Sequence, residues 1–501
     1  MDLLSNLALG LSVALSWDNL LYCFIGSLLG TLIGVLPGVG PVATIAMLLP
    51  VTFTLQPTGA LIMLAGIYYG AQYGGSTTAI LVNLPGEASS IVTCLDGHAM
   101  AREGRAGAAL AIAAIGSFFA GSVATLVVAM VSAPLVALAR AFGPAEYFAL
   151  MILGLVLSVV LARGSPLKAV AMILLGMALS LIGTDVHTGA VRLTFGISSI
   201  AGGLDFVPIA MGLFGLSEII SNLERGQERG QEKLSKSVHG LTPTRADLAQ
   251  STPAILRGTV LGTVLGVLPG ASSMIASFAS YALEKKLAKD PARFGNGAIE
   301  GVAGPESANN AGAQSSFIPM LTLGIPSNSV MALMTGALMI QGIVPGPMVM
   351  EKQPALFWGV IVSMWIGNAM LLIINLPLIG IWVRLLDVPY RLLFPAILLL
   401  CAIGVYSLNN EPTQVVLCAI FGLIGYLLIK LGCEPAPLLL GFVLGDMMEE
   451  NLRRAMQISR GDPIAMLSSP VCMVLLTASC AFILMMVLPA IVRGREKLVD
   501  D

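Results

Sequence analysis

The sequence predicts an all-α polytopic membrane protein built from two homologous halves, and three observations lead to that prediction. Hydrophobic residues make up 56% of the 501-residue chain and charged residues only 11%, whereas soluble proteins carry about 25% charged residues. No Lys or Arg occurs before Arg102. Residues 26–38 and 258–270 are identical at nine of thirteen positions. An ordinary soluble enzyme is therefore excluded, and about 20 residues per span predict about ten to twelve membrane segments.

The recurring segment predicts a broken or re-entrant helix in each half. Glycines recur at every fourth position from Gly26 and from Gly258, so they share one helix face that a second helix can approach closely. We interpret these glycines as packing residues. Pro-Gly at 37–38 and at 269–270 then interrupts the helix, because proline lacks an N–H group and glycine adopts unusual dihedral angles. A duplicated membrane chain with such breaks is typical of the substrate site of a secondary transporter.

The repeat extends beyond this segment and predicts the domain boundaries. Residues 208–225 align with 437–454, and Pro85 aligns with Pro326. A hydrophilic stretch separates the two halves. We therefore predict a first membrane repeat at 1–222, a cytoplasmic linker at 223–250, a second membrane repeat at 251–454, and a C-terminal membrane helix with a short tail at 455–501.

The distribution of basic residues favours an inverted repeat. The stretch 285–293 after the second break carries four basic residues, whereas its counterpart, 51–59, carries no charge. Conversely, Arg102 and Arg105 follow Pro85 in the first half. Basic loops stay in the cytoplasm, so equivalent loops are expected on opposite faces of the membrane. The pair at 453–454 opposes this pattern, because its counterpart is the basic linker.

Four short polar segments interrupt the apolar sequence, at 36–41, 68–87, 268–273 and 305–329. Backbone groups freed by a helix break survive at membrane depth only around a cavity. The restarted helices would direct N–H groups toward an anion, and the freed carbonyl groups could ligate Na⁺. The candidate residues for substrate or ion binding are Pro37, Gly38, Gly40, Gly74, Gly75, Ser76, Thr77, Asn83, Pro269, Gly270, Ser272, Ser273, Asn309, Asn310, Gly324, Pro326, Ser327 and Asn328.

In the fourth segment, Glu306, Asn310 and Gln314 form one polar stripe if the stretch is helical. Function is the default interpretation of such a stripe at membrane depth, and the alternative is hydrogen bonding between helices. We favour a substrate-lining role for Asn309 and Asn310. Glu306 lies near the membrane interface or acts as an ion or proton ligand, and the sequence leaves both alternatives open.

The sequence argues against metal, nucleotide and nucleic-acid chemistry. The three histidines form no H-E-x-x-H motif and the seven cysteines form no C-x-x-C pair. The glycine-rich run 74–78 lacks the lysine of a phosphate loop, so we predict no ATP hydrolysis. We expect no metal, no cofactor and no nucleic-acid partner, and membrane lipid around the chain. We interpret Asp96-Gly97-His98 as a solvated turn.

Several long blocks carry a family resemblance. They are L-P-G-V-G-P (36–41), L-L-P-V-T-F (48–53), A-G-I-Y-Y-G-A-Q-Y-G-G-S (65–76), L-D-G-H-A-M-A-R-E-G-R-A-G-A-A-L (95–110), A-S-F-A-S-Y-A-L-E-K-K (276–286), F-G-N-G-A-I-E-G-V-A-G-P-E-S-A-N-N-A (294–311) and L-T-L-G-I-P (321–326). Together they closely resemble the large membrane subunit of the tripartite tricarboxylate transporter family. The chain departs from the family pattern after Pro326, where Ser327-Asn328 replaces the usual Gly-Ser.

The resemblance implies an importer of three parts in a bacterial inner membrane, with this multi-pass chain as the permease. A periplasmic solute-binding protein would deliver an organic acid such as citrate. A small four-helix membrane subunit would accompany the permease, and symport with Na⁺ or H⁺ would supply the energy. The alternatives are a permease of the same family for a dicarboxylate, an aromatic acid or an amino acid, a polytopic membrane enzyme, and a passive channel.

Overall fold

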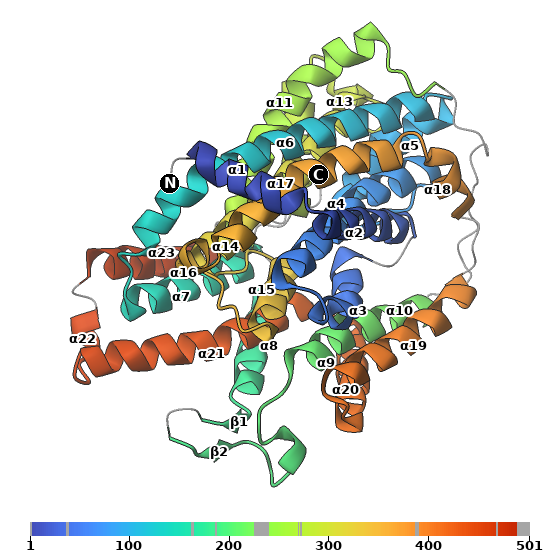
Figure 1. Cartoon of the computed structure of the whole chain (residues 1–501). Coiled ribbons are helices and arrows are strands. Elements are labelled where there is room, and N and C mark those ends of the chain that lie inside the picture. Colours follow the sequence, from blue (N-terminus) through green and yellow to red (C-terminus); the bar gives the residue numbers. More distant parts are fainter. Residues whose placement is uncertain are drawn as a thin grey trace.

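The computed structural model describes residues 3–36, 40–161, 165–185, 188–224, 240–268, 270, 273–385, 390–466 and 469–487, and these form a bundle of helices (Figure 1). In this described part the strands are β1 (Gly183–Thr184) and β2 (Val191–Arg192), which pair antiparallel in one small hairpin. The predicted all-α class is confirmed.

The helices of the first half often begin at proline, whose fixed φ angle and missing N–H group suit the first helical position. They are α1 (Leu3–Ala14), α2 (Trp17–Val35), α3 (Pro41–Phe53), α4 (Pro57–Val82), η1 (Ala88–Ser90), α5 (Ile91–Arg102), α6 (Ala106–Ala139), α7 (Pro144–Leu161), α8 (Pro166–Ser180), η2 (Ser198–Ile200), α9 (Phe206–Ala210), η3 (Met211–Leu216) and α10 (Ser217–Glu224).

The second half begins with a helix at Arg245, inside the stretch predicted as a linker. Its helices are α11 (Arg245–Val267), α12 (Ser273–Leu287), η4 (Pro291–Arg293), α13 (Glu300–Ser315), α14 (Phe317–Leu323), α15 (Ser329–Ile340), α16 (Pro347–Lys352), α17 (Pro354–Asn375), α18 (Ile379–Leu385), α19 (Tyr390–Asn409), α20 (Pro412–Lys430), α21 (Pro435–Ile458), α22 (Pro463–Met466) and α23 (Pro470–Val487).

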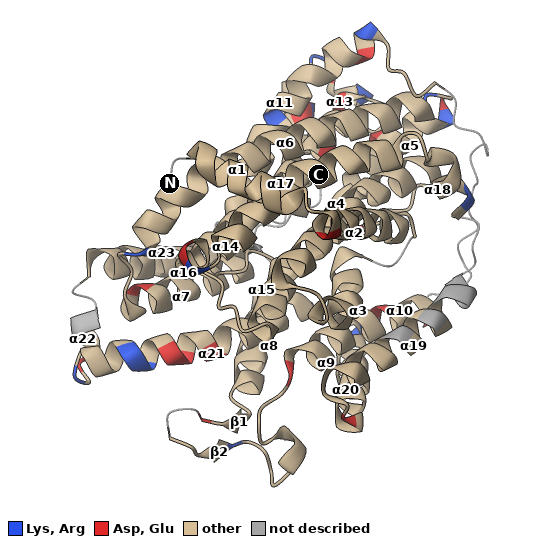
Figure 2. Ribbon diagram, viewed as in Figure 1, with Lys and Arg blue, Asp and Glu red and all other residues tan. Residues whose placement is uncertain are grey.

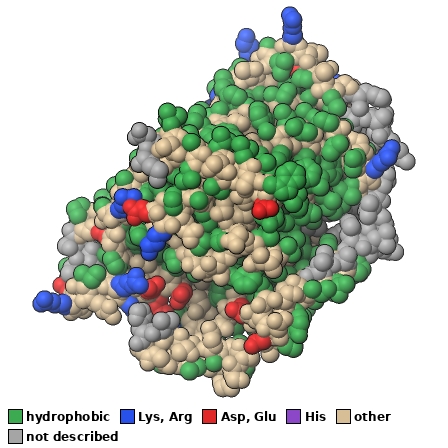
Figure 3. All heavy atoms as spheres, viewed as in Figure 1, with side chains coloured by type: hydrophobic (Ala, Val, Ile, Leu, Met, Phe, Trp, Pro, Cys, Tyr) green, Lys and Arg blue, Asp and Glu red, His purple; other side chains and the backbone are tan. Residues whose placement is uncertain are grey.

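The molecule is a polytopic membrane protein by the length and apolar character of its helices. Among the described residues, five helical segments are long and apolar enough to cross a membrane, and several shorter apolar helices accompany them. Large apolar side chains remain exposed on outward faces, as at Leu256, Val260 and Val264 along one side of α11. Figure 3 shows apolar side chains over much of the visible face, and Figure 2 places Lys and Arg mainly toward helix ends and loops.

The glycine rows pack helices closely, as the sequence predicts. In α2, a Cβ placed on Gly30 would overlap the backbone of Ile67 in α4, and in α11 a Cβ on Gly262 would overlap the backbone of Ala308 in α13. The other glycines in the two rows make equivalent contacts with α4 and α13. Only glycine permits such a close approach of backbones, so the packing interpretation is confirmed.

The end of each half packs on a helix of the other half. Helix α21 packs on α8, and η3 packs on α20. The segment that includes η3 is the one whose sequence aligns with α21. Reciprocal contacts of this kind, in which equivalent segments each pack on the other half, are expected of a duplicated chain. The orientation of the two halves across a membrane stays a prediction. Two helices add to this core, because α1 packs on α17 and α23 packs on α7.

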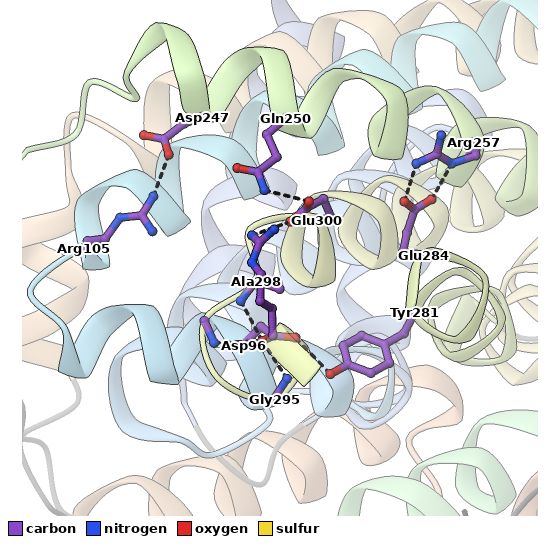
Figure 4. Close-up of polar contacts among 12 residues, drawn as sticks. Asp96, Arg105, Asp247, Gln250, Arg257, Tyr281, Glu284, Gly295, Ala298 and Glu300 are labelled. Carbon is purple, nitrogen blue, oxygen red and sulfur yellow. Dashed lines mark hydrogen bonds and ion pairs between the residues drawn. The ribbon is translucent and has the colours of Figure 1, made fainter. Parts of the chain in front are cut away.

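Asp96 corrects one interpretation from sequence, because it is fully buried within α5 rather than solvated in a turn. Its Oδ1 accepts hydrogen bonds from the backbone N–H groups of Gly295 and Gly297 at 2.8 and 2.9 Å, and of Ala298 at 2.8 Å. Its Oδ2 accepts one from the Tyr281 hydroxyl at 2.9 Å (Figure 4). These four donors replace water around the buried carboxylate.

One ion pair near Asp96 adds to this contact between the halves, and a second stabilises the second half itself. Arg105, which precedes α6, lies 2.6 Å from Asp247 at the start of α11. Within the second half, Arg257 of α11 makes two hydrogen bonds to Glu284 of α12, at 2.8 and 2.5 Å (Figure 4). Asp247 is also the third residue of a capping box with Thr244, so this carboxylate both caps α11 and binds the first half.

Candidate functional site

A cavity of about 550 Å³ lies where the two predicted helix breaks meet. The first break contributes Gly40 and the start of α3, and the second contributes Gly270 and the start of α12. Two further loops from equivalent positions, 85–89 and 327–329, complete its lining together with residues of α4, α7, η3, α10, α20 and α21. Segments more than 200 residues apart thus form one site.

Helix N-termini converge on this cavity. The first residues of α3, α12, α15 and α21 all line it, namely Pro41, Ser273, Ser329 and Pro435. The first N–H groups of a helix lack partners within the helix, and the helix dipole places partial positive charge at this end. Their combined field favours an anion in the cavity.

Gly270 holds the second break against the 327–329 loop. Its N–H group donates to the carbonyl oxygen of Ser327 at 2.7 Å. Its φ angle is +81°, and a Cβ would lie 2.6 Å from the Cα of Ser158 in α7. Glycine is therefore required for both its conformation and its contact. Asn328 stabilises the restarted helix, because its Oδ1 accepts the N–H group of Met331 at 3.0 Å as the N-cap of α15.

Asn83 and Gly324 end equivalent helices just before the prolines of the two loops. Asn83 is the C-cap of α4 with φ +54°, and Gly324 is the C-cap of α14 with φ +74°. Both conformations are left-handed, which glycine and asparagine tolerate best. Neither residue lines the cavity, so their observed role is to direct the chain into the loops at Pro85 and Pro326.

The candidate residues from sequence separate into three groups. Those that line the cavity are Gly40, Gly270, Ser273, Ser327 and Asn328. Those placed outside its lining are Gly74, Gly75, Ser76, Thr77, Asn83, Asn309, Asn310, Gly324 and Pro326. Those that lie outside the described residues are Pro37, Gly38, Pro269 and Ser272.

The chain matches the sequence model of the tripartite tricarboxylate transporter TctA family over residues 20–440. It belongs to that family. Because the family is one of transporters, the chain is a membrane transport protein and not an enzyme.

Two relatives come from Agrobacterium vitis. One, named as an uncharacterised 52.8 kDa protein in the TAR-I ttuC′ 3′ region, is 58% identical over 498 residues, which is 99% of each chain. The other, named as an uncharacterised protein in the TAR-II ttuC′ 3′ region, is 59% identical over 241 residues, or 48% of this chain and all of the relative. No solved structure matches the chain.

Several lining residues of this TctA-family cavity were not among the candidates from sequence. Tyr68, Gln72 and Glu87 lie at or near the ends of the second polar segment. Gln72 could have been chosen from the sequence, because it is a polar side chain within an apolar helix. Ser158 and Ser217 also line the cavity. Single serines in apolar helices are common and bond to their own backbone, as Ser217 does to Leu213, so the sequence offered no signal for them.

No Lys, Arg or His lines the cavity among the described residues, whereas Glu87, Glu218 and Glu434 do. An anion there would be held by backbone N–H groups, hydroxyl groups and amides rather than by a fixed cation. Glu87, which pairs with no Lys, Arg or His among the described residues, would oppose an anion unless a proton or a metal cation neutralises it. The cavity therefore suits an anion that binds together with a cation.

The stripe predicted at 306–314 is helical, within α13, and it is buried. Glu306 is 1% exposed, so it has no contact with solvent. Asn310 donates from Nδ2 to Ser117 Oγ of α6 at 2.7 Å, and Asn309 donates from Nδ2 to Glu87 Oε1 at 3.1 Å. Asn309 thus reaches the cavity through Glu87, whereas Asn310 joins two helices.

Proposed function

We propose that the chain is the permease of a bacterial inner-membrane importer that carries an organic carboxylate through this cavity, driven by a gradient of Na⁺ or H⁺. The observation that carries the proposal is the convergence of two broken segments and several helix N-termini on one cavity whose described lining has no basic side chain. A volume of about 550 Å³ falls in the range of small-molecule sites and accommodates a di- or tricarboxylate.

The lining supports a carboxylate over a neutral substrate. Gln72 and Asn328 offer amide donors, and Ser273 and Ser329 offer hydroxyl donors at helix starts. Donors of this kind bind carboxylate oxygens without the desolvation cost of a buried lysine. Asn328 stands where the family usually has serine. We therefore expect its amide group to influence which carboxylate is preferred.

Family membership supports the partners of the proposed system. A tripartite transporter has two further components, which we propose are a small four-helix membrane subunit and a periplasmic solute-binding protein. In this scheme the binding protein delivers the carboxylate to the periplasmic side of the cavity. The coupled cation neutralises part of the charge of the substrate and the nearby carboxyl groups.

The test is uptake of labelled citrate into proteoliposomes that contain both membrane subunits, with the loaded binding protein outside. We expect uptake that saturates, requires the binding protein and stops when the Na⁺ or pH gradient is collapsed. Flux that neither saturates nor depends on a gradient would indicate a channel instead. Competition by succinate, benzoate or glutamate distinguishes a tricarboxylate permease from one for a dicarboxylate, an aromatic acid or an amino acid.

A matched pair of variants connects uptake to the cavity. Gly270→Leu is expected to abolish uptake, because the side chain would be strained at φ +81° and would collide with Ser158. Gly202→Leu is the control, since a Cβ there meets nothing within 4 Å. Both proteins should insert in the membrane in similar amounts. Normal uptake by Gly270→Leu would contradict the assignment of the break to the transport path.

A further inference from the structure

Among the described residues, the carboxyl group of Glu306 has no positive partner although it is almost fully buried in α13. Its Oε2 lies 2.5 Å from Ser76 Oγ of α4, and its Oε1 lies 2.5 Å from Thr93 Oγ1 of α5. No Lys, Arg or His forms an ion pair with it among the described residues. An unpaired ionised carboxylate is strongly disfavoured at such a position. The group is therefore neutral or has a cation bound to it.

The hydroxyl contacts favour the neutral acid. Ser76 Oγ also lies 3.0 Å from the carbonyl oxygen of Gln72, yet a serine hydroxyl has a single hydrogen to donate. If Oε2 of Glu306 carries a proton, it donates that proton to Ser76 Oγ. The Ser76 hydroxyl then donates to the backbone carbonyl oxygen of Gln72, and the Thr93 hydroxyl donates to Oε1 of Glu306. Every contact then has one hydrogen. If Glu306 is ionised, Glu306 and Gln72 compete for the one hydrogen of Ser76.

Polar side chains of α4, η1 and α13 lie between this group and the cavity. Gln72 lines the cavity, and its Oε1 lies 3.1 Å from Ser89 Oγ, which also contacts Glu87. Asn309, less than one turn after Glu306 on α13, donates to Glu87, while its own Oδ1 is buried and has no partner in the described part of the chain. Gln72 thus contacts the hydroxyl partner of Glu306 through its backbone carbonyl group and the cavity through its side chain, and Asn309 places an unused acceptor near both.

We propose that Glu306 is the site at which the coupled proton binds, so that the carboxylate and H⁺ move together; this rests on the proposed transport function. The proton adds to Oε2 from the periplasmic side when the substrate enters the cavity, and it leaves to the cytoplasm after the substrate has left. The group alternates between the neutral acid, which the buried state described here holds, and the ionised form, which requires access to water.

Other titratable groups face Glu306 from the helices packed around it. They are Tyr73 of α4, Cys94 of α5 and Glu87 before η1. Glu284 of α12 approaches α13 at Gly304 but is paired with Arg257 of α11, and α6 contributes the uncharged Ser117. Among these groups Glu87 is the other acid without a positive partner in the described residues, and it lines the cavity directly.

The test uses Glu306→Gln in the complete transporter reconstituted in proteoliposomes. Glutamine has the shape of the protonated acid, and its amide can donate to Ser76 in the same way. Two readouts are compared with labelled citrate: exchange at equal internal and external concentration without a gradient, and net accumulation driven by a pH gradient. Glu103→Gln, at an exposed position, is the control.

We expect Glu306→Gln to retain exchange within about two-fold of the wild type and to lose at least about ten-fold of the accumulation driven by the pH gradient. Glu306→Asp, which still titrates, should recover part of that accumulation, and Glu103→Gln should match the wild type. Accumulation by Glu306→Gln at the wild-type level would overturn the inference, as would loss of exchange, because a permanent mimic of the neutral acid should still exchange.

Citrate accumulation by the wild type under each gradient tests the proton site and the proposed function separately. Accumulation of citrate that follows a Na⁺ gradient and ignores a pH gradient would overturn the proton site while leaving the permease intact. No gradient-driven uptake of any of the carboxylates by the wild type would contradict the proposed function itself. Uptake that follows the pH gradient, with loss only in Glu306→Gln, supports both.

Discussion

Replacing Gly30 by alanine tests the close contact between α2 and α4. A Cβ at residue 30 would overlap the carbonyl oxygen of Ile67, with its Cα 2.8 Å away. Backbone atoms cannot rotate aside as a side chain can, so α2 must shift. Overpacking costs about 1–3 kcal/mol, and we take the upper end because the contact is with backbone. Alanine regains about 1 kcal/mol over glycine in a helix, which leaves a net loss of about 2 kcal/mol.

The assay is reversible unfolding of the purified protein in detergent, with Gly262→Ala as the equivalent change in α11. That Cβ would overlap the backbone of Ala308 in α13, so a similar loss is expected. The double variant should lose roughly the sum, because the sites share no partners. Gly40→Ala is the control, since its Cβ would meet nothing within 4 Å and its φ angle is −81°. Stabilisation by Gly30→Ala, as helix propensity alone would give, would refute the close packing.

Three further predictions concern other parts of the molecule. Asp96→Ala should lower the melting temperature, because the buried N–H group of Ala298 loses its acceptor at about 1–3 kcal/mol and the N–H groups of Gly295 and Gly297 lose theirs; an unchanged melting curve would contradict this. Cysteines introduced at Thr54 and Lys289, in equivalent loops, should be labelled from the periplasm and the cytoplasm respectively, and labelling from one side only would contradict inversion. Asn310→Ala should cost on the order of 0.6 kcal/mol and leave citrate uptake nearly normal, because Asn310 bonds Ser117 outside the cavity; loss of uptake with an unchanged melting temperature would place it at the substrate.

The sequence predicts local features of this fold well. Glycines at every fourth position predict close helix contacts because their spacing matches the helix repeat, and Gly30 and Gly262 confirm it. The segment around Gly270 is predicted as a break, and its positive φ angle agrees. Pro85 and Pro326, which align in the sequence, lie in the equivalent loops that follow Asn83 and Gly324. In each case the physical cause lies within a few neighbouring residues.

Features that depend on distant segments could not be predicted in this way. Asp96 can be buried because backbone N–H groups between Gly295 and Ala298, about 200 residues later in the chain, donate hydrogen bonds to its carboxylate. Ser158 lines the cavity because α7 packs directly against the backbone of Gly270. Asn310 belongs to the predicted polar stripe, yet its partner is Ser117 of α6 and it does not line the cavity. Only the packing of whole helices decides which polar residue reaches the cavity.

The central claim is that a carboxylate binds in the cavity between the two helix breaks, and cysteine protection at Ser329 tests it most directly. Ser329 lines the cavity and is partly exposed. In a variant with the seven native cysteines replaced and Ser329→Cys added, the rate of modification by a charged thiol reagent is measured with and without citrate in transport-competent proteoliposomes. We predict that citrate slows modification at Ser329 with the same half-saturating concentration as uptake. Saturating citrate that supports uptake but leaves this rate unchanged would contradict the account.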